Sequence, residues 1–228
     1  MTALTRRLLA VLALAAPLAA TAEVRPFALP EDHRTIGKTT SFAEMESLLR
    51  ALDGTGIVTV SVEGRSVSGR PLYVVHLARG ERPAWRVLLY AQQHGDEVSG
   101  KDALLVLIRD IARNPGLLPA DVDLWIMPMA NPDGAEADTR RNAAGADLNR
   151  DHTALEQPET QALHRLARRL LPHVAVDCHE FSRDSESWRT RGWLKWPDIT
   201  MDSLNNPLFD RAVRAAAQRR SGPEHLEA

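Results

Sequence analysis

Cysteine is almost absent from this 228-residue sequence, because Cys178 is the only one and no disulfide can form within the chain. An excess of charge of one sign is lacking too, since 28 basic and 30 acidic residues leave a formal net charge of −2. That balance gives no reason to expect nucleic acid or an anionic membrane surface as a partner. The length and the 44% hydrophobic content suit one sizeable domain with a buried core.

Long hydrophobic runs are lacking as well, apart from one near the N-terminus. Arg6 and Arg7 precede an apolar run that ends in the small residues Ala20–Ala22. This is the layout of a secretory signal peptide, and the run is too short and too alanine-rich for a membrane span. An N-terminal anchor helix is the alternative. We therefore predict a signal peptide over residues 1–22 and an exported chain, periplasmic or extracellular, that begins near Glu23 and has no stable membrane association.

The rest of the sequence alternates between strand-like and helix-like segments. Ser41, Glu44 and Gly54 are typical of the capped start and the glycine end of a helix. The expected elements are an arm over 27–40, a helix over 41–54, a hairpin over 56–80, a strand over 85–92, a helix over 100–114, a strand over 122–130, a loop over 131–157, a helix over 158–171 and a strand over 173–180. Such alternation implies an α/β fold with a mixed, largely parallel central sheet and helices on both faces.

A histidine and a glutamate stand three residues apart just after the strand expected over 85–92. His94 and Glu97 could supply two of the three protein ligands of a catalytic zinc ion. They could equally be polar residues of an ordinary loop, because a lone His-x-x-Glu pair is a weak signal. Their position favours a site, since α/β sheets bind ligands beyond the carboxyl ends of their strands.

The third ligand should come from the same edge of the sheet. His179 follows the apolar strand expected over 173–180, so it is the residue best placed for this role. A histidine there could also be an ordinary strand-end residue with a satisfied hydrogen bond. Cys178 lies in the same apolar run, which favours an inert buried thiol over a nucleophile.

A long polar loop follows the strand expected over 122–130. Loops of this length inside a compact domain are usually functional or disordered. Guanidinium groups beside a metal site suit a substrate carboxylate, which arginine can hold through two hydrogen bonds. A solvated loop with scattered ion pairs is the alternative. The polar side chains of interest are Arg140, Arg141, Asn142, Asp147, Asn149 and Arg150.

Four segments in this order carry a more specific signal. "EGRSVSGRPLYVVHL", "HGDE", "NPDG…TRRNAAGADLNRD" and "VDCHEF" together resemble the zinc carboxypeptidases of peptidase family M14. The resemblance spans about residues 56–181. It implies the carboxypeptidase α/β fold, one zinc ion and the cleavage of peptide bonds. Together with the predicted signal peptide over 1–22, it suggests an N-terminal arm and helix over 23–55 and a carboxypeptidase-like domain over 56–228, whose last strands we expect to be missing.

The resemblance assigns the metal site. It implies that His94, Glu97 and His179 bind zinc. Asp147 resembles the carboxylate that accepts a hydrogen bond from the first ligand histidine and so fixes its tautomer.

The resemblance also assigns the substrate-binding groups. Arg140 resembles the arginine that polarises the scissile carbonyl and stabilises the oxyanion. Asn149 and Arg150 resemble the pair that binds the terminal carboxylate of the substrate. Arg141 is expected to be a neighbour, although a one-residue shift would exchange it with Arg140.

The general base departs from the family pattern. In the family it is a glutamate on a strand well after the third zinc ligand, with a tyrosine before it. No tyrosine follows His179 here, and Glu180 should point away from the site if strand geometry continues. We therefore expect the sequence to be the front part of a longer enzyme. A chain that uses Glu180 or Glu186 instead, or that binds zinc without hydrolysis, is the alternative.

A segment rich in tryptophan and basic residues follows the third ligand. Trp188, Trp193 and Trp196 alternate there with basic side chains, which suits a loop that shapes the substrate pocket. Aromatic packing of a plain loop onto the domain is the alternative. Aromatic and basic residues together can also bind nucleic acid, but the export signal and the balanced charge are against it.

Three functions remain open from the sequence. The first is a monomeric zinc carboxypeptidase that acts on exported or cell-wall peptides. The second is a related N-acyl amino acid deacylase of the desuccinylase type, which the signal peptide disfavours. The third is a zinc- or peptide-binding module without catalysis.

Overall fold

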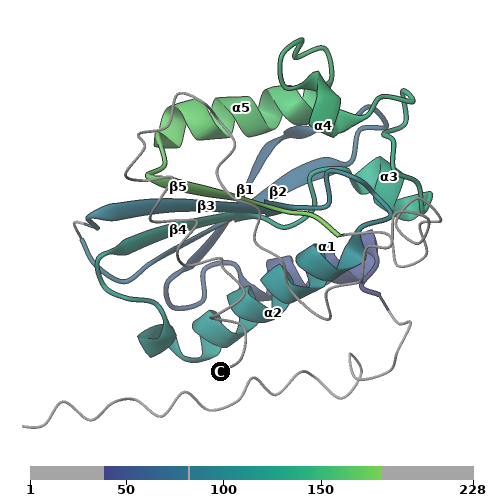
Figure 1. Cartoon of the computed structure of the whole chain (residues 1–228). Coiled ribbons are helices and arrows are strands. Elements are labelled where there is room, and N and C mark those ends of the chain that lie inside the picture. Colours follow the sequence, from purple (N-terminus) through teal and green to yellow (C-terminus); the bar gives the residue numbers. More distant parts are fainter. Residues whose placement is uncertain (1–38, 82, 181–228) are drawn as a thin grey trace, which may run out of the picture. The chain divides into compact units, whose positions relative to one another are not determined.

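A five-stranded mixed sheet forms the centre of the fold in the computed structural model, which describes residues 39–81 and 83–180. The strands lie in the order β1-β2-β4-β3-β5. Helices cover the sheet: α5 lies on one face, and α1 and α2 lie on the other (Figure 1). The elements are α1 (Phe42–Leu52), β1 (Val58–Arg65), β2 (Pro71–Ala78), β3 (Trp85–Ala91), α2 (Val98–Arg113), η2 (Pro115–Leu117), β4 (Val122–Met127), α3 (Pro132–Glu136), α4 (Leu148–Asp151), α5 (Pro158–Leu170) and β5 (Val174–Cys178).

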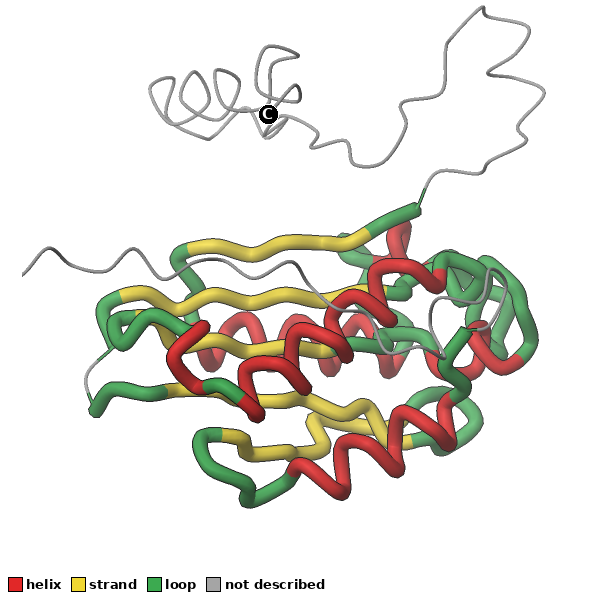
Figure 2. The backbone as a smooth tube through the Cα atoms, turned by 90° about the horizontal axis from the view of Figure 1, so that it is seen from below, coloured by secondary structure: helices red, strands yellow, loops and turns green. Residues whose placement is uncertain are grey.

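The strand directions confirm the predicted largely parallel sheet. β3 pairs in parallel with both β4 and β5, whereas β2 is antiparallel to its neighbours β1 and β4. Four strands therefore run in one direction and only β2 runs against them. Figure 2 shows the strands side by side from the face that α1 and α2 cover. The hairpin predicted over 56–80 is the antiparallel pair β1 and β2.

Two apolar clusters fill the layers above and below the sheet. The larger one joins α1 and α2 to the sheet through buried residues such as Leu49, Ile108 and Ile126. The smaller one lies under α5 and includes Leu88 and Leu166. Alternate side chains of β3 face the two clusters, so this strand is covered on both faces as its continuous apolar sequence predicts.

The helix signals of the sequence have the expected local structure. The side chain of Ser41 accepts a hydrogen bond from the backbone N–H of Glu44, and the Glu44 carboxylate accepts one from the backbone N–H of Ser41. This capping box starts α1. Gly54 follows the helix with a φ of 73°, a left-handed conformation that glycine adopts without strain.

The segment over 131–157 differs from the predicted plain loop, because it contains the short helices α3 and α4. Asn131 accepts a hydrogen bond from Gly134 N–H, and Asp147 accepts one from Asn149 N–H, so each side chain starts a helical turn. The signal peptide predicted over residues 1–22 and the tryptophan-rich segment lie outside the described residues. Within the described ones, no helix combines the length and the apolar character needed to cross a membrane.

Candidate metal centre

Three side chains meet at the carboxyl ends of the neighbouring parallel strands β3 and β5. His94 lies in the loop after β3, and Glu97 is the residue that precedes the first turn of α2. His179 directly follows β5. Because β3 and β5 are adjacent and parallel, their ends lie at one edge of the sheet and bring the three residues together.

The three side chains form a compact set of donor atoms. One ring nitrogen of each histidine and one carboxylate oxygen of Glu97 all lie within 4.8 Å of one another. His94 Nδ1 is 2.6 Å from Glu97 Oε1, and His179 Nδ1 is 2.7 Å from Glu97 Oε2. The exposed side-chain fraction rises from 3% at His94 to 12% at Glu97 and 28% at His179, so the set opens to solvent on the His179 side.

Each histidine contacts an aspartate through Nε2, the ring nitrogen that faces away from Glu97. His94 Nε2 is 3.2 Å from Asp147 Oδ1, as the sequence predicts for Asp147. His179 Nε2 is 2.9 Å from Asp177 Oδ2, a partner that the sequence reasoning missed. The two-residue spacing of Asp177 and His179 could have indicated this contact, because side chains two residues apart on an extended chain lie on the same face. A proton on Nε2 that is donated to the aspartate leaves Nδ1 free to bind a metal.

Charge and hydrogen bonding oppose desolvation at this site. Burial alone would raise the pKa of Glu97, but hydrogen bonds from His179, His94 and the backbone N–H of Glu180 hold it below its ordinary value. Hydrogen bonds to Asp177 and Glu97 raise the pKa of His179 to about 10 in the metal-free chain. A metal ion must therefore displace a proton from His179 when it binds.

Two interlocked loops place His94. An added Cβ on Gly95 would lie 2.0 Å from the backbone carbon of Gly134, so only glycine fits there. The side-chain amide of Asn131 donates to the backbone carbonyl of Gln93 at 3.1 Å, and the amide of Gln92 donates to the carbonyl of Gly95 at 2.8 Å. The motifs "HGDE" and "NPDG" therefore form one structural unit.

The two adjacent arginines are placed differently. The guanidinium of Arg140 contacts Asp147 at 3.0 Å and lies 3.2 Å from His94 Nδ1. Desolvation alone would raise the pKa of Asp147, but the hydrogen bond and ion pair with Arg140 hold this pKa below its ordinary value. The guanidinium of Arg141 instead donates to the carbonyl of Gly145 at 2.8 Å. Of the two, Arg140 is the one beside the three-residue set.

Among the other predicted residues, Asn149 and Glu180 also lie at this edge. Asn149 Nδ2 is 3.1 Å from His179 Nε2, and Arg150 follows it with an exposed side chain. The carboxylate of Glu180 accepts a hydrogen bond from the backbone N–H of Ser99 at 3.1 Å. That contact places the Glu180 carboxylate at the start of α2, two residues from Glu97, and Glu180 itself lies beyond the end of β5. Glu186 lies outside the described residues.

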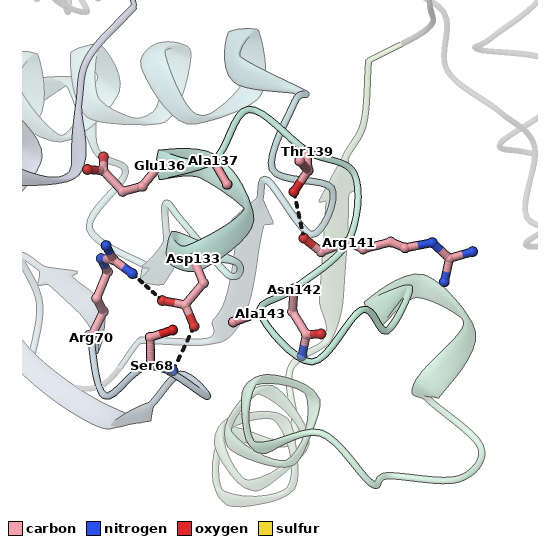
Figure 3. A pocket seen from close by; sticks show the side chains of 9 residues that line it. All are labelled: Ser68, Arg70, Asp133, Glu136, Ala137, Thr139, Arg141, Asn142 and Ala143. Atoms are coloured by element: carbon pink, nitrogen blue, oxygen red, sulfur yellow. Dashed lines mark hydrogen bonds and ion pairs between the residues drawn. The ribbon is translucent and has the colours of Figure 1, made fainter.

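A polar pocket of about 310 Å³ lies beside α3 (Figure 3). Asp133 lines it and accepts hydrogen bonds from Ser66 Oγ, Ser68 N–H and the Arg70 guanidinium at 2.6–2.9 Å. The side chain of Arg141 extends away from Asp133 in Figure 3. Since Asp133 is fully engaged, its contacts attach the turn of the β1–β2 hairpin to α3.

Comparison with known proteins decides the family. A family model described as zinc carboxypeptidase matches residues 45–167, more than half of the chain. The chain belongs to the zinc carboxypeptidase family. Among curated relatives, carboxypeptidase 2 of Trichophyton tonsurans is 28% identical over 77% of this chain and 35% of its own length. Carboxypeptidase SOL1 of Arabidopsis thaliana is 36% identical over 44% of this chain and 24% of its own length.

Solved structures agree with this zinc carboxypeptidase assignment. A metallo-carboxypeptidase from Burkholderia cenocepacia is 28% identical, with a TM-score of 0.59 over 63% of this chain and 42% of that one. A metallo-carboxypeptidase from Pseudomonas aeruginosa, in complex with (2-guanidinoethylmercapto)succinic acid, is 28% identical, with a TM-score of 0.54 over 63% of this chain and 40% of that one. The chain spans about a quarter to a third of the length of the first curated relatives.

Proposed function

We propose that His94, Glu97 and His179 bind one zinc ion and that the protein is a metallocarboxypeptidase. The observation that carries this proposal is the convergence of their three donor atoms within 4.8 Å. Two imidazoles and one carboxylate are the ligand set of several catalytic zinc sites, which keep a further position open. The aspartates behind both imidazoles and the solvent access beside His179 fit that chemistry.

When bound, zinc supplies Lewis acidity, which lowers the pKa of a water molecule and polarises a carbonyl. Asp147 holds the Nε2 proton of His94 and pairs with Arg140, so both groups keep fixed positions. The side chain of Arg140 is 45% exposed, and its guanidinium lies beside His94 and Glu97. From there it can donate to a substrate carbonyl and stabilise the negative charge that develops on its oxygen.

Substrate selection follows from the remaining cationic and amide groups. Asn149 lies next to His179, and the guanidinium of Arg150 donates to the backbone carbonyl of Asn149. Both residues are proposed to bind the terminal carboxylate of a peptide. The relative from Pseudomonas aeruginosa was solved with a derivative of succinic acid, which carries carboxylates. That ligand supports a site built to bind carboxylates.

The setting of the reaction is also part of this proposal. The predicted signal peptide over residues 1–22 would place the enzyme in the periplasm or outside the cell, where exported or cell-wall peptides are its substrates. The arm and helix over 23–55 would precede a carboxypeptidase-like domain over 56–228. We propose that this chain acts as a monomer and binds neither nucleic acid nor membrane.

A three-substrate assay tests the proposal. The zinc-loaded protein, produced from its full coding sequence, is incubated with a peptide that has a free carboxyl terminus, with the same peptide amidated at that end, and with an N-acyl amino acid. Release of the C-terminal residue from the first peptide alone is expected. Cleavage of the N-acyl amino acid alone would indicate a deacylase. Binding of the free peptide without any cleavage would indicate a binding module.

A further inference from the structure

A chain of hydrogen bonds leads from the metal centre toward α5. The side-chain amide of Gln93 donates from Nε2 to Asp177 Oδ2 at 2.7 Å. Gln93 Oε1 is 2.8 Å from His152 Nε2, and His152 Nδ1 is 3.0 Å from His164 Nε2. Asp177 in turn contacts His179. The chain therefore links the loop after β3, the end of β5, the residue after α4 and the middle of α5.

Chemistry fixes the direction of the two hydrogen bonds that the Gln93 side chain makes. The carboxylate of Asp177 can only accept, so the NH₂ group of Gln93 must face it and the amide oxygen must face His152. His152 then carries a proton on Nε2, and in the neutral form of the ring its Nδ1 accepts from Nε2 of His164. If the amide of Gln93 were rotated by 180°, its oxygen would face the carboxylate of Asp177 and its NH₂ group would face the proton on His152 Nε2. Neither pair could form a hydrogen bond.

Burial restricts the hydrogen-bond chain at Gln93 more than at Asp177 and His179. Only 1% of Gln93 is exposed, whereas the side chain of Asp177 is 25% exposed and that of His179 is 28% exposed. In the described part of the chain, β5 pairs with β3 alone, so the end of β5 has a neighbouring strand on one side only. Gln93 is the buried side chain that contacts this end of β5, through its hydrogen bond to Asp177.

We propose that Gln93 is a positioning residue for the third metal ligand, and that His152 and His164 support it. Gln93 holds Asp177, and Asp177 holds His179 with its proton on Nε2 and its Nδ1 toward the metal. This inference rests on the proposed zinc site. It extends the support of His179 through Asp177 and Gln93 to two histidines that have no place in the proposed chemistry.

Gln93→Leu tests the proposal, because leucine has nearly the same volume and cannot make either hydrogen bond. We expect a loss of zinc affinity of up to about 10-fold, the lower end of the 10- to 100-fold loss that follows removal of a direct partner of a metal ligand, because Gln93 acts through Asp177. Affinity is measured by competition with a chelator, and the visible spectrum of the cobalt-loaded chain reports the ligand geometry. Gln157→Leu is the matched control, since Gln157 bonds to Asn142 and not to the metal centre.

A double-variant cycle separates positioning from general stability. If Gln93 acts through Asp177, the double variant of Gln93→Leu and Asp177→Asn loses no more affinity than the worse single variant. Additive losses, or wild-type zinc binding by Gln93→Leu, would overturn the proposal. His152→Phe keeps a ring and removes both nitrogens, so it serves if Gln93→Leu does not fold. A smaller loss is expected from it, and no loss would contradict the proposal.

Nitrogen-detected NMR of the metal-free chain checks the hydrogen-bond chain without zinc. At a pH where both rings are neutral, we expect His152 and His164 to carry their protons on Nε2 and the signals of His152 to shift in Gln93→Leu. The opposite tautomer at His152 would overturn the proposal. A wild-type chain that binds no zinc would contradict the proposed function, and the tautomers would then decide separately whether Gln93 organises this chain.

Discussion

His94 and His179 face each other across the carboxylate of Glu97, with ring centroids 4.8 Å apart. Both turn Nδ1 toward Glu97 and Nε2 toward an aspartate, although they lie 85 positions apart in the sequence. This shared orientation would present Nδ1 of both imidazoles to a metal ion while Nε2 of each contacts a carboxylate, as is usual for metal-binding histidines. It also indicates which substitutions should lower zinc affinity, because each one would remove a contact that orients a histidine.

Asp147→Asn should lower zinc affinity by about 10- to 100-fold while the chain stays folded. The amide can still contact His94, but it no longer holds the proton on Nε2 by charge, and it loses the ion pair with Arg140. Chelator competition measures the effect. Asp123→Asn is the control, because Asp123 pairs with His76 on the sheet instead. Equal losses in both variants would contradict the assigned role of Asp147.

Gly95→Ala should abolish tight zinc binding. The new methyl group would lie 2.0 Å from the backbone carbon of Gly134, so the loop that carries His94 must move. Gly116→Ala is the control, since its nearest contact is a side-chain oxygen of Asn114 at 3.1 Å. Zinc content after dialysis distinguishes the two variants. Unchanged zinc in Gly95→Ala would show that the two loops are not interlocked as described.

Asp133→Ala should reduce the free energy of unfolding by about 1–3 kcal/mol, the cost of leaving buried hydrogen-bond partners unsatisfied. Ser66, Ser68 and Arg70 all lose an acceptor, and the hairpin turn loses its attachment to α3. Denaturant unfolding of the metal-free chain measures the change. Glu136→Ala, which removes one exposed contact to Phe42 N–H, should have a clearly smaller effect. Equal effects would contradict the attachment role.

The stability of the metal-free chain should depend on pH through His179. Its pKa is raised to about 10, above the ordinary value of 6.5, so the folded state binds this proton more tightly than the unfolded state. The resulting stabilisation is fully present below pH 6.5 and is lost as the pH rises to about 10. Thermal unfolding across this range measures it. In His179→Gln this fall should disappear, and its persistence would assign it to another group.

The stabilisation that zinc provides should have the opposite pH dependence between pH 6.5 and about 10. Binding displaces the proton of His179, so the stabilisation that added zinc provides should grow as the pH rises. The difference in unfolding temperature with and without zinc reports this gain. A gain that shrinks with rising pH would contradict the placement of His179 among the ligands.

The sequence predicted the elements well because their signals are local. The capping box at Ser41, the apolar run of β3 and the alternation of strands and helices each reflect short-range preferences. The helical turns that Asn131 and Asp147 start were missed, because each rests on one side chain that accepts from a nearby backbone N–H. Short helices of this kind carry no apolar periodicity.

The set of His94, Glu97 and His179 was predicted, and the structure brings the three together. Their partners were predicted unevenly. Asp147 followed from the family resemblance, and Asp177 was missed although it stands only two residues before His179. Gln93 contacts Asp177 only because the folded sheet brings the loop after β3 beside β5. The choice of Arg140 over Arg141 also needed the structure, since adjacent residues in a loop share no fixed direction.

Zinc stoichiometry tests the central claim most directly. The wild-type chain is loaded with zinc, dialysed and analysed for metal beside His179→Ala and the control His173→Ala, whose imidazole accepts from Arg86 N–H instead. We predict one tightly bound zinc ion in the wild type and in His173→Ala, and none in His179→Ala. Tight stoichiometric zinc in His179→Ala would contradict the assignment of the metal centre.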